Sequence, residues 1–214
     1  MKYSVKEVYY TVQGEGAQSG RPAVFVRFSG CNLWSGLDND RTKGPGGCST
    51  WCDTDFVGTD GVGGGQFDSA HSLATKALDT WCKTSEAQPF VVCTGGEPLL
   101  QLDEKLIDAF HKNGFELAIE TNGTLAIPRG VDWTCVSPKG SAKLIVHTGN
   151  ELKLVFPQIG MDPRRFEHLD FHHFSLQPLD NNKRNENTKA ALEYCLAHPK
   201  WKLSLQTHKY LGVP

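Results

Sequence analysis

The sequence has little net charge of either sign and no long apolar run. Its 22 Lys and Arg residues against 24 Asp and Glu residues give a formal net charge of −2 at pH 7, a balance that favours neither nucleic acid nor an anionic membrane as a partner. No apolar stretch approaches the ~20 residues that a helix needs to cross a bilayer. The first residues, from Met1 to Glu7, do not follow the pattern of a secretory signal peptide. We therefore expect a cytoplasmic protein with no membrane and no nucleic-acid partner.

The cysteines do not form a recognisable disulfide framework, since there are seven of them and an odd number cannot pair completely. Four lie inside apolar patterns and are predicted to be buried structural thiols: Cys82, Cys93, Cys135 and Cys195. The other three, Cys31, Cys48 and Cys52, lie together in polar, glycine-rich sequence. They are the candidates for chemistry.

In the first part of the chain, up to residue 83, the sequence predicts two strands and one helix. Strands are expected at residues 4–12 and 23–28. Apolar residues at helical spacing predict a helix over 70–83, and Asp68-Ser69 before it can cap its first turn. Residues 59–65 carry no strand or helix signal and predict a mobile connection.

The rest of the chain alternates between apolar strands and helices. Strands are predicted at 89–98, 115–123, 133–139, 151–157 and 173–180, helices at 103–114 and 186–198, and a last strand with a short tail at 201–214. Such alternation favours an α/β fold with a mostly parallel sheet. Polar residues end several of these strands, and in parallel α/β folds this edge forms the active-site face. We predict a partial (β/α) barrel of the TIM type, folded as one domain over 1–214, with an inserted loop at about 31–54.

The cysteine-bearing loop suggests a metal centre. Three thiolates that converge suit a soft metal or an iron–sulfur cluster. A structural zinc site usually needs a fourth protein ligand, and this loop contains no histidine. Three ligands with one open position favour a metal centre that does chemistry, with a structural zinc loop as the alternative.

Several uncommon motifs carry a family resemblance. They are YTVQGEG at 10–16, FVRFSGCNLWSG at 25–36, CDTDFVGTDG at 52–61, FVVCTGGEPLLQLD at 90–103, AIETNGTL at 118–125, VSPK at 136–139, NELK at 150–153, LQPLD at 176–180 and LSLQTHKYLGVP at 203–214. Over essentially its whole length the sequence resembles the 7-carboxy-7-deazaguanine synthases, which are radical S-adenosylmethionine (SAM) enzymes, and specifically their bacterial branch with an enlarged cysteine loop. The spacing departs from the family pattern, because sixteen residues separate Cys31 from Cys48 and three separate Cys48 from Cys52.

The resemblance implies the cofactors and their ligands. Cys31, Cys48 and Cys52 would bind three irons of a [4Fe–4S] cluster, and the fourth iron would bind SAM, whose cleavage yields a 5′-deoxyadenosyl radical. Thr54 would bind Mg²⁺ beside the substrate, a role compatible with the preference of Mg²⁺ for oxygen ligands. The SAM contacts implied are Trp51, Cys52, Asp53, Gly96, Ser137, Pro138, Lys139, Gln177, Pro178, Leu179 and Asp180.

The substrate implied is 6-carboxy-5,6,7,8-tetrahydropterin. Its binding residues would be Val12, Gln13, Gly14, Arg27, Thr94 and Pro214, the last through a terminal carboxylate. Arg27 offers a planar fork to a carboxylate. It also lies in an apolar strand, where an unpaired charge is expensive, and this favours a ligand role. Glu15 and His208 are weaker candidates.

The reaction implied is hydrogen abstraction from C6, radical ring contraction and loss of ammonia, which would make the protein a carbon–nitrogen lyase of queuosine and 7-deazapurine biosynthesis. The sequence singles out no general base. A flavodoxin or ferredoxin as electron donor and a homodimer are also implied by the resemblance. Two alternatives stay open: another radical SAM enzyme such as a glycyl-radical activase, which would not need Gln13, Arg27, Thr54 or Pro214, and a non-catalytic zinc or iron–sulfur protein.

Overall fold

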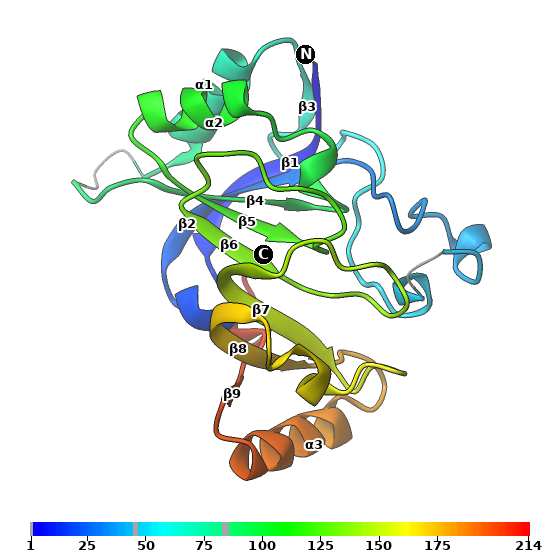
Figure 1. The fold of residues 1–214 in the computed structure, drawn as a ribbon. Helices are drawn as coiled ribbons and strands as arrows, with labels where there is room; N and C mark the ends of the chain where they lie inside the picture. The colour runs from blue at the N-terminus through cyan, green and yellow to red at the C-terminus, as the bar shows by residue number, and fades with distance from the viewer. Residues whose placement is uncertain (1, 45–46, 83–85) are drawn as a thin grey trace.

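The computed structural model describes residues 2–44, 47–82 and 86–214 (Figure 1). These residues form one nine-stranded sheet in the order β3-β1-β2-β4-β5-β6-β7-β8-β9. The strands are β1 (Tyr3–Val12), β2 (Pro22–Phe28), β3 (Gly65–Phe67), β4 (Phe90–Gly95), β5 (Glu116–Thr121), β6 (Trp133–Val136), β7 (Thr148–Phe156), β8 (Asp170–Pro178) and β9 (Trp201–Leu203). The helices are α1 (Ala70–Thr80), α2 (Glu104–Lys112), α3 (Arg184–Ala197) and α4 (Thr207–Leu211).

The sheet is mostly parallel and open. From β2 to β9 all neighbouring strands pair in parallel, whereas β1 is antiparallel to both β2 and β3. Within the described ranges no ladder joins the edge strands β3 and β9, so the barrel does not close. The prediction of a partial barrel is therefore confirmed. No α-helix of the described chain lies between β5 and β6 or between β6 and β7, so the outer helical layer is incomplete as well.

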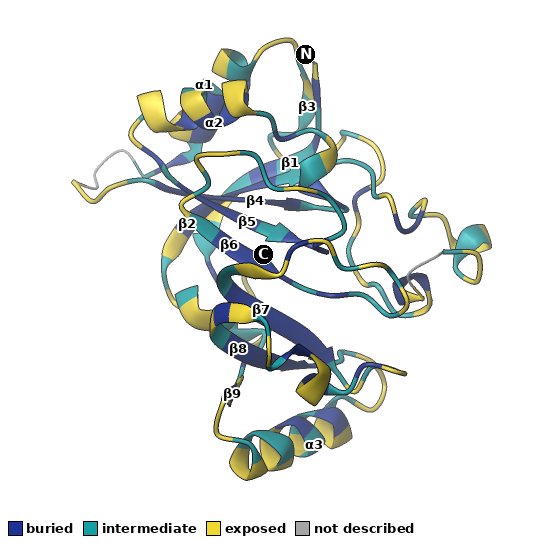
Figure 2. Ribbon diagram, in the orientation of Figure 1, coloured by how far each residue is buried: buried dark blue, intermediate teal, exposed yellow. Residues whose placement is uncertain are grey.

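Two hydrophobic cores lie against this sheet. The first packs α1 and α2 against β1, β2, β4 and β5, with Val26, Ile119 and Phe110 fully buried. The second packs α3 against β7, β8 and β9 around Leu154, Leu176 and Trp201. Figure 2 shows the burial on the strands and the exposure on the outer helix faces. This pattern follows from strands that are apolar on both faces and helices that are apolar on one.

Local signals set the starts of α1 and α2. Ser69 accepts a hydrogen bond from the Ser72 backbone N–H, and the Ser72 side chain completes a capping box. Asp103 accepts a hydrogen bond from the Leu106 N–H at the start of α2. These side chains satisfy amides that the first helical turn leaves without partners.

Residues 59–65, predicted to be a mobile connection without strand or helix, are hydrogen-bonded to β1 and lead into β3. Gly61 N–H donates to Lys6 O at 2.9 Å, Val8 N–H donates to Val62 O at 2.8 Å, and β3 then pairs with β1. A Cβ at Gly61 or Gly64 would lie 2.7 or 2.1 Å from Lys6 O. Glycine here permits close backbone packing, which gives no sequence periodicity and so no strand signal.

The end of the chain also differs from prediction. After β9 it forms α4 instead of a plain tail. Gly212 follows α4 in the left-handed conformation at φ 66°, and the Val213 N–H donates back to His208 O at 3.2 Å. This turn brings Pro214 to the wall of a cavity. Among the described helices, none combines the length and apolar character of a membrane span.

Candidate active site

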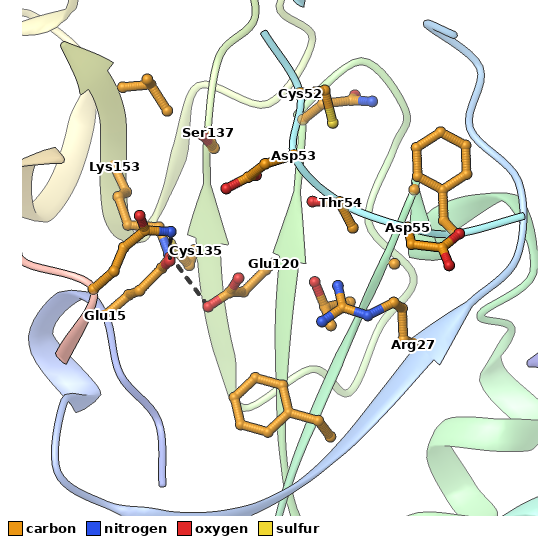
Figure 3. Close-up of a pocket in the computed structure, with 18 of the residues that line it drawn as sticks. Glu15, Arg27, Cys52, Asp53, Thr54, Asp55, Glu120, Cys135, Ser137 and Lys153 are labelled. Carbon is orange, nitrogen blue, oxygen red and sulfur yellow. Dashed lines mark hydrogen bonds and ion pairs between the residues drawn. The ribbon is translucent and has the colours of Figure 1, made fainter. Parts of the chain in front are cut away.

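A cavity of about 370 Å³ lies at the carboxyl ends of the parallel strands (Figure 3). Its wall includes most of the residues proposed from the sequence: Val12, Gln13, Gly14, Arg27, Cys31, Cys48, Trp51, Cys52, Asp53, Thr54, Thr94, Gly96, Ser137, Lys139, Gln177 and Pro214, together with Glu15 and His208. Pro138, Pro178, Leu179 and Asp180 do not line it. The fold therefore brings together residues from the first loop, the cysteine loop, seven strands and the end of the chain.

The turn between Cys48 and Cys52 is helical. Gly47 enters it at φ 69°, and the Cys48 carbonyl accepts hydrogen bonds from Trp51 N–H at 3.0 Å and Cys52 N–H at 2.8 Å. Residues four apart on a helical turn lie on the same face. The three intervening residues thus present both thiols to one side, the side of the cavity.

Arg41 holds this part of the loop together. Its Nη1 donates to Ser49 O at 2.9 Å and to Cys52 O at 3.2 Å, and its guanidinium lies 4.6 Å from the centre of the Trp34 ring. The Ser49 hydroxyl donates back to Arg41 O. The residues inserted between Cys31 and Cys48 therefore contribute a side chain that positions the last two cysteines.

The three loop thiols, Cys31, Cys48 and Cys52, line one cavity. Cysteine thiolates are the usual ligands of iron–sulfur clusters, so this donor set fits the [4Fe–4S] cluster that the resemblance implies. Burial raises the pKa of Cys31, and burial raises the pKa of Cys48 to about 11. Cluster binding would therefore release protons from these thiols.

The Gly-Gly-Glu segment, residues 95–97, also has a role in the packing of the fold. Glu97 is fully buried and accepts hydrogen bonds from Thr121 Oγ1 at 2.7 Å, Asn122 N–H at 2.8 Å and Leu99 N–H at 3.0 Å. Burial raises the pKa of Glu97. A Cβ on Gly96 would lie 2.2 Å from Gly30 O. The glycine is thus required by the backbone that leads into Cys31, in addition to any contact with SAM.

Arg27 is paired within the protein. Its Nε donates to Glu7 Oε1 at 2.7 Å and its Nη2 to the Tyr9 hydroxyl at 3.1 Å, both across the β1–β2 pair. The unpaired charge that suggested a ligand role is therefore absent. Arg27 nevertheless lines the cavity, and its guanidinium lies on the same side of it as Thr54 (Figure 3). The Thr54 hydroxyl forms no hydrogen bond within the described chain, unlike a threonine that caps a turn.

A buried ionic network lies deeper in the cavity. Lys153 Nζ lies 2.5 Å from Glu15 Oε2 and 3.3 Å from Glu120 Oε1, and Gln13 Nε2 donates to the same Glu120 oxygen at 2.9 Å. Burial would lower the pKa of Lys153, but Glu120 and Glu15 raise it well above its usual value. Burial would likewise raise the pKa of Glu15, but Lys153 lowers it to about 2. At neutral pH the ammonium and the Glu15 carboxylate are both charged.

Sequence reasoning assigned no role to Glu120 or Lys153. The signal was present, because Lys153 lies between Leu152 and Leu154 and Glu120 directly follows the apolar run Leu117–Ile119. Only the strand order shows that β5 and β7 bring the two side chains to the same cavity as Glu15.

Glu15 also accepts hydrogen bonds from two side-chain amides. Its Oε1 accepts from Gln206 Nε2 at 2.9 Å and from Gln177 Nε2 at 3.2 Å. Gln177 Oε1 is buried and has no hydrogen-bond partner in the part of the chain that the structure describes. Buried acceptors are normally satisfied, so this cavity-lining amide is suited to accept a hydrogen bond from a ligand.

The C-terminal helix α4 closes one side of the cavity. Lys209 Nζ lies 2.9 Å from Asp53 Oδ2 and 2.5 Å from Asp180 Oδ2, and thereby links the cysteine loop to the end of β8. Asp180 is thus tied to the site without lining it. A Cβ on Gly14 would lie 2.0 Å from His208 Nδ1, so glycine is needed for the imidazole to pack there. Burial lowers the pKa of His208.

Comparisons with known proteins agree in one family, although no protein-family model matches the chain. The 7-carboxy-7-deazaguanine synthase of Bordetella pertussis is 59% identical over 214 residues, covering 100% of both chains. The protein of that name from Caulobacter vibrioides is 56% identical, also over the whole of both chains. Among solved structures, the crystal structure of QueE from Escherichia coli matches with a TM-score of 0.69 and 28% identity, covering 97% of this chain and 95% of that one.

Proposed function

Because the chain belongs to the 7-carboxy-7-deazaguanine synthase family, whose members are radical SAM enzymes of 7-deazapurine biosynthesis, we propose that it converts 6-carboxy-5,6,7,8-tetrahydropterin to 7-carboxy-7-deazaguanine with loss of ammonia. The observation that supports this substrate is that the cysteines and the predicted substrate-binding residues share one cavity. It joins the three loop cysteines to Gln13, Arg27 and Thr54, residues that a protein-activating radical enzyme or a structural zinc protein would not need.

The family implies a [4Fe–4S] cluster and SAM. Cys31, Cys48 and Cys52 would hold the cluster, since they are the cysteines of the loop that line the cavity. Gly96, Ser137, Lys139 and Gln177 line the same wall and would contact SAM. When bound and reduced, these cofactors supply the oxidising power that removes a hydrogen atom from the substrate.

The substrate carboxylate and a Mg²⁺ ion would lie between Arg27 and Thr54. The Thr54 hydroxyl is free to serve as one oxygen ligand, and Mg²⁺ commonly takes its other ligands from substrate and water. Arg27, held by Glu7 and Tyr9, presents its remaining nitrogen donors in a fixed orientation. The pairing lowers the cost of burying the guanidinium before the substrate arrives.

The flat polar edge of the pterin would be read by the segment Val12–Gly14 and by Pro214, which closes the cavity from the chain end. Glu120 would take up a proton from the ring. Its hydrogen bonds in the described chain all reach Oε1, so Oε2 has no protein partner. Lys153 Nζ lies 3.3 Å from Glu120 Oε1 and holds this side chain in the cavity wall.

A cytoplasmic location, a homodimer and a flavodoxin or ferredoxin as electron donor complete the proposal. The location is supported by the cysteines, which form no disulfide within the described chain, as expected in a reducing compartment. The dimer and the electron donor rest on the resemblance alone.

The test is anaerobic turnover. Protein with a reconstituted cluster is reduced in the presence of SAM, Mg²⁺ and the carboxytetrahydropterin, and the products are identified by mass spectrometry. We expect 7-carboxy-7-deazaguanine and ammonia from the wild type and neither from Cys52→Ser. A protein with a full cluster that cleaves SAM but forms no deazapurine would refute the assigned substrate.

A further inference from the structure

We propose that Glu151 is a positioning residue that fixes the segment Gln13–Glu15 in the orientation needed to read the substrate, without touching the substrate itself. The proposal rests on the function given above, in which this segment contacts the pterin. Glu151 lies on β7, is 2% exposed and is not part of the cavity wall.

The carboxylate of Glu151 accepts hydrogen bonds from the backbone that follows this segment. Ala17 N–H donates to Oε2 at 3.0 Å and to Oε1 at 3.2 Å, and Ser175 Oγ donates to Oε1 at 2.5 Å. No cation forms an ion pair with Glu151 within the described ranges. The hydrogen bonds from Ala17 and Ser175 therefore offset the cost of burying this charge.

The contact is close enough to define the path of the chain. Gly16 adopts φ 66°, and a Cβ there would lie 2.5 Å from Glu151 Oε2. The Gly16 N–H donates to Ser204 Oγ at 2.7 Å. Two side chains therefore hold the turn, Glu151 from β7 and Ser204 from the segment after β9, and Ser175 on β8 donates to Glu151 behind them.

The anchored turn directly follows the residues that line the cavity. The Glu15 backbone N–H donates to Gln13 Oε1 at 3.0 Å. The Gln13 side chain, which reaches Glu120, is thus tied to the backbone of Glu15, whose own side chain reaches Lys153. Releasing Ala17 would allow Glu15 and Gln13 to move together. In the described chain the Glu151 side chain accepts hydrogen bonds from Ala17 and Ser175, and none joins it to the cysteine loop.

The experiment compares Glu151→Ala and Glu151→Gln with wild type and with Glu167→Gln. Glu167 is a matched control, because its carboxylate accepts from Trp201 Nε1 at 2.9 Å in the second core and has no link to the segment. The measurements are KM and kcat for the carboxytetrahydropterin, cluster content, and SAM cleavage without substrate. Hydrogen exchange of residues 13–18 reports on the turn independently of catalysis.

We expect Glu151→Ala to raise KM for the pterin about tenfold or more, the effect of losing a hydrogen bond to a charged group. Cluster content and substrate-free SAM cleavage should equal those of wild type, and exchange of residues 13–18 should accelerate. Glu151→Gln should be milder, because its amide oxygen still accepts from Ala17. If Glu151→Ala does not fold, Gly16→Ala perturbs the same contact from the other side and should also raise KM.

Two outcomes would overturn the proposal. One is a pterin KM within twofold of wild type in folded, cluster-loaded Glu151→Ala. The other is an equal loss of substrate-free SAM cleavage, which would indicate general damage. A wild type that forms no deazapurine while Glu151→Ala accelerates exchange would instead refute the proposed function and leave the anchoring contact established.

Discussion

Replacing Lys153 by Met removes the buried ammonium that lies between the two partly buried carboxylates of Glu15 and Glu120. Lys153 Nζ lies 2.5 Å from Glu15 and 3.3 Å from Glu120, and its side chain is 5% exposed. Breaking a buried ion pair from one side costs about 3–5 kcal/mol, because the remaining charge is left uncompensated. Met keeps most of the volume, so the loss is electrostatic.

The pKa of Glu15 gives a second estimate of how much Lys153 stabilises the folded protein. Lys153 outweighs burial and lowers the pKa of Glu15 from 4.5 to about 2. A folded-state pKa below the unfolded value stabilises the protein above pH 4.5, and this stabilisation is lost as the pH falls toward 2. The linkage corresponds to roughly 3 kcal/mol at neutral pH. In Lys153→Met the largest contribution that lowers the pKa of Glu15 is lost, and the Gln206 hydrogen bond and the nearby His208 are left to oppose burial, so the pKa of Glu15 should rise.

The assay is urea unfolding of wild type and Lys153→Met in the same metal-loading state, from pH 7 to pH 3. We expect the variant to be less stable by about 3 kcal/mol at pH 7. The difference in the free energy of unfolding between the two proteins should become smaller below about pH 5, because Glu15 becomes protonated in the variant. Lys202→Met, at an exposed position on β9, serves as control and should change stability little. A Lys153→Met protein as stable as wild type at pH 7, or a difference independent of pH, would refute this reasoning.

Three further predictions concern the ends of the cavity and the thiols. Thr54→Ala should reduce the stimulation of turnover by Mg²⁺ with cluster content unchanged, and an unaltered Mg²⁺ titration would remove Thr54 from the metal site. Adding several residues after Pro214 should raise KM for the pterin more than it lowers cluster assembly; equal kinetics in the extended protein would argue against a role for this residue. Because burial raises the pKa of Cys48 to about 11, cluster reconstitution should become more complete from pH 7 to pH 9, and an iron content independent of pH would contradict the protonated state of this thiol.

The sequence alone determined those features that depend on neighbours along the chain. The apolar strands and the capped helices α1 and α2 follow from local periodicity and from Ser69 and Asp103. The three loop cysteines were recognisable because they lie in polar, glycine-rich sequence. Polar residues at successive strand ends indicated the active-site edge, and most of them do line the cavity.

Only the tertiary structure decided which charges meet. Glu7 faces Arg27, Lys153 lies between Glu15 and Glu120, and Glu151 holds Ala17 across 134 residues of sequence. The same holds for Gly96, whose missing side chain accommodates Gly30, and for the glycines at 61 and 64. The physical reason is that the need for a charged residue or a glycine at a given position depends on the atom that packs against it. Which atom lies opposite is set by strand order and register, and neither is encoded in local periodicity.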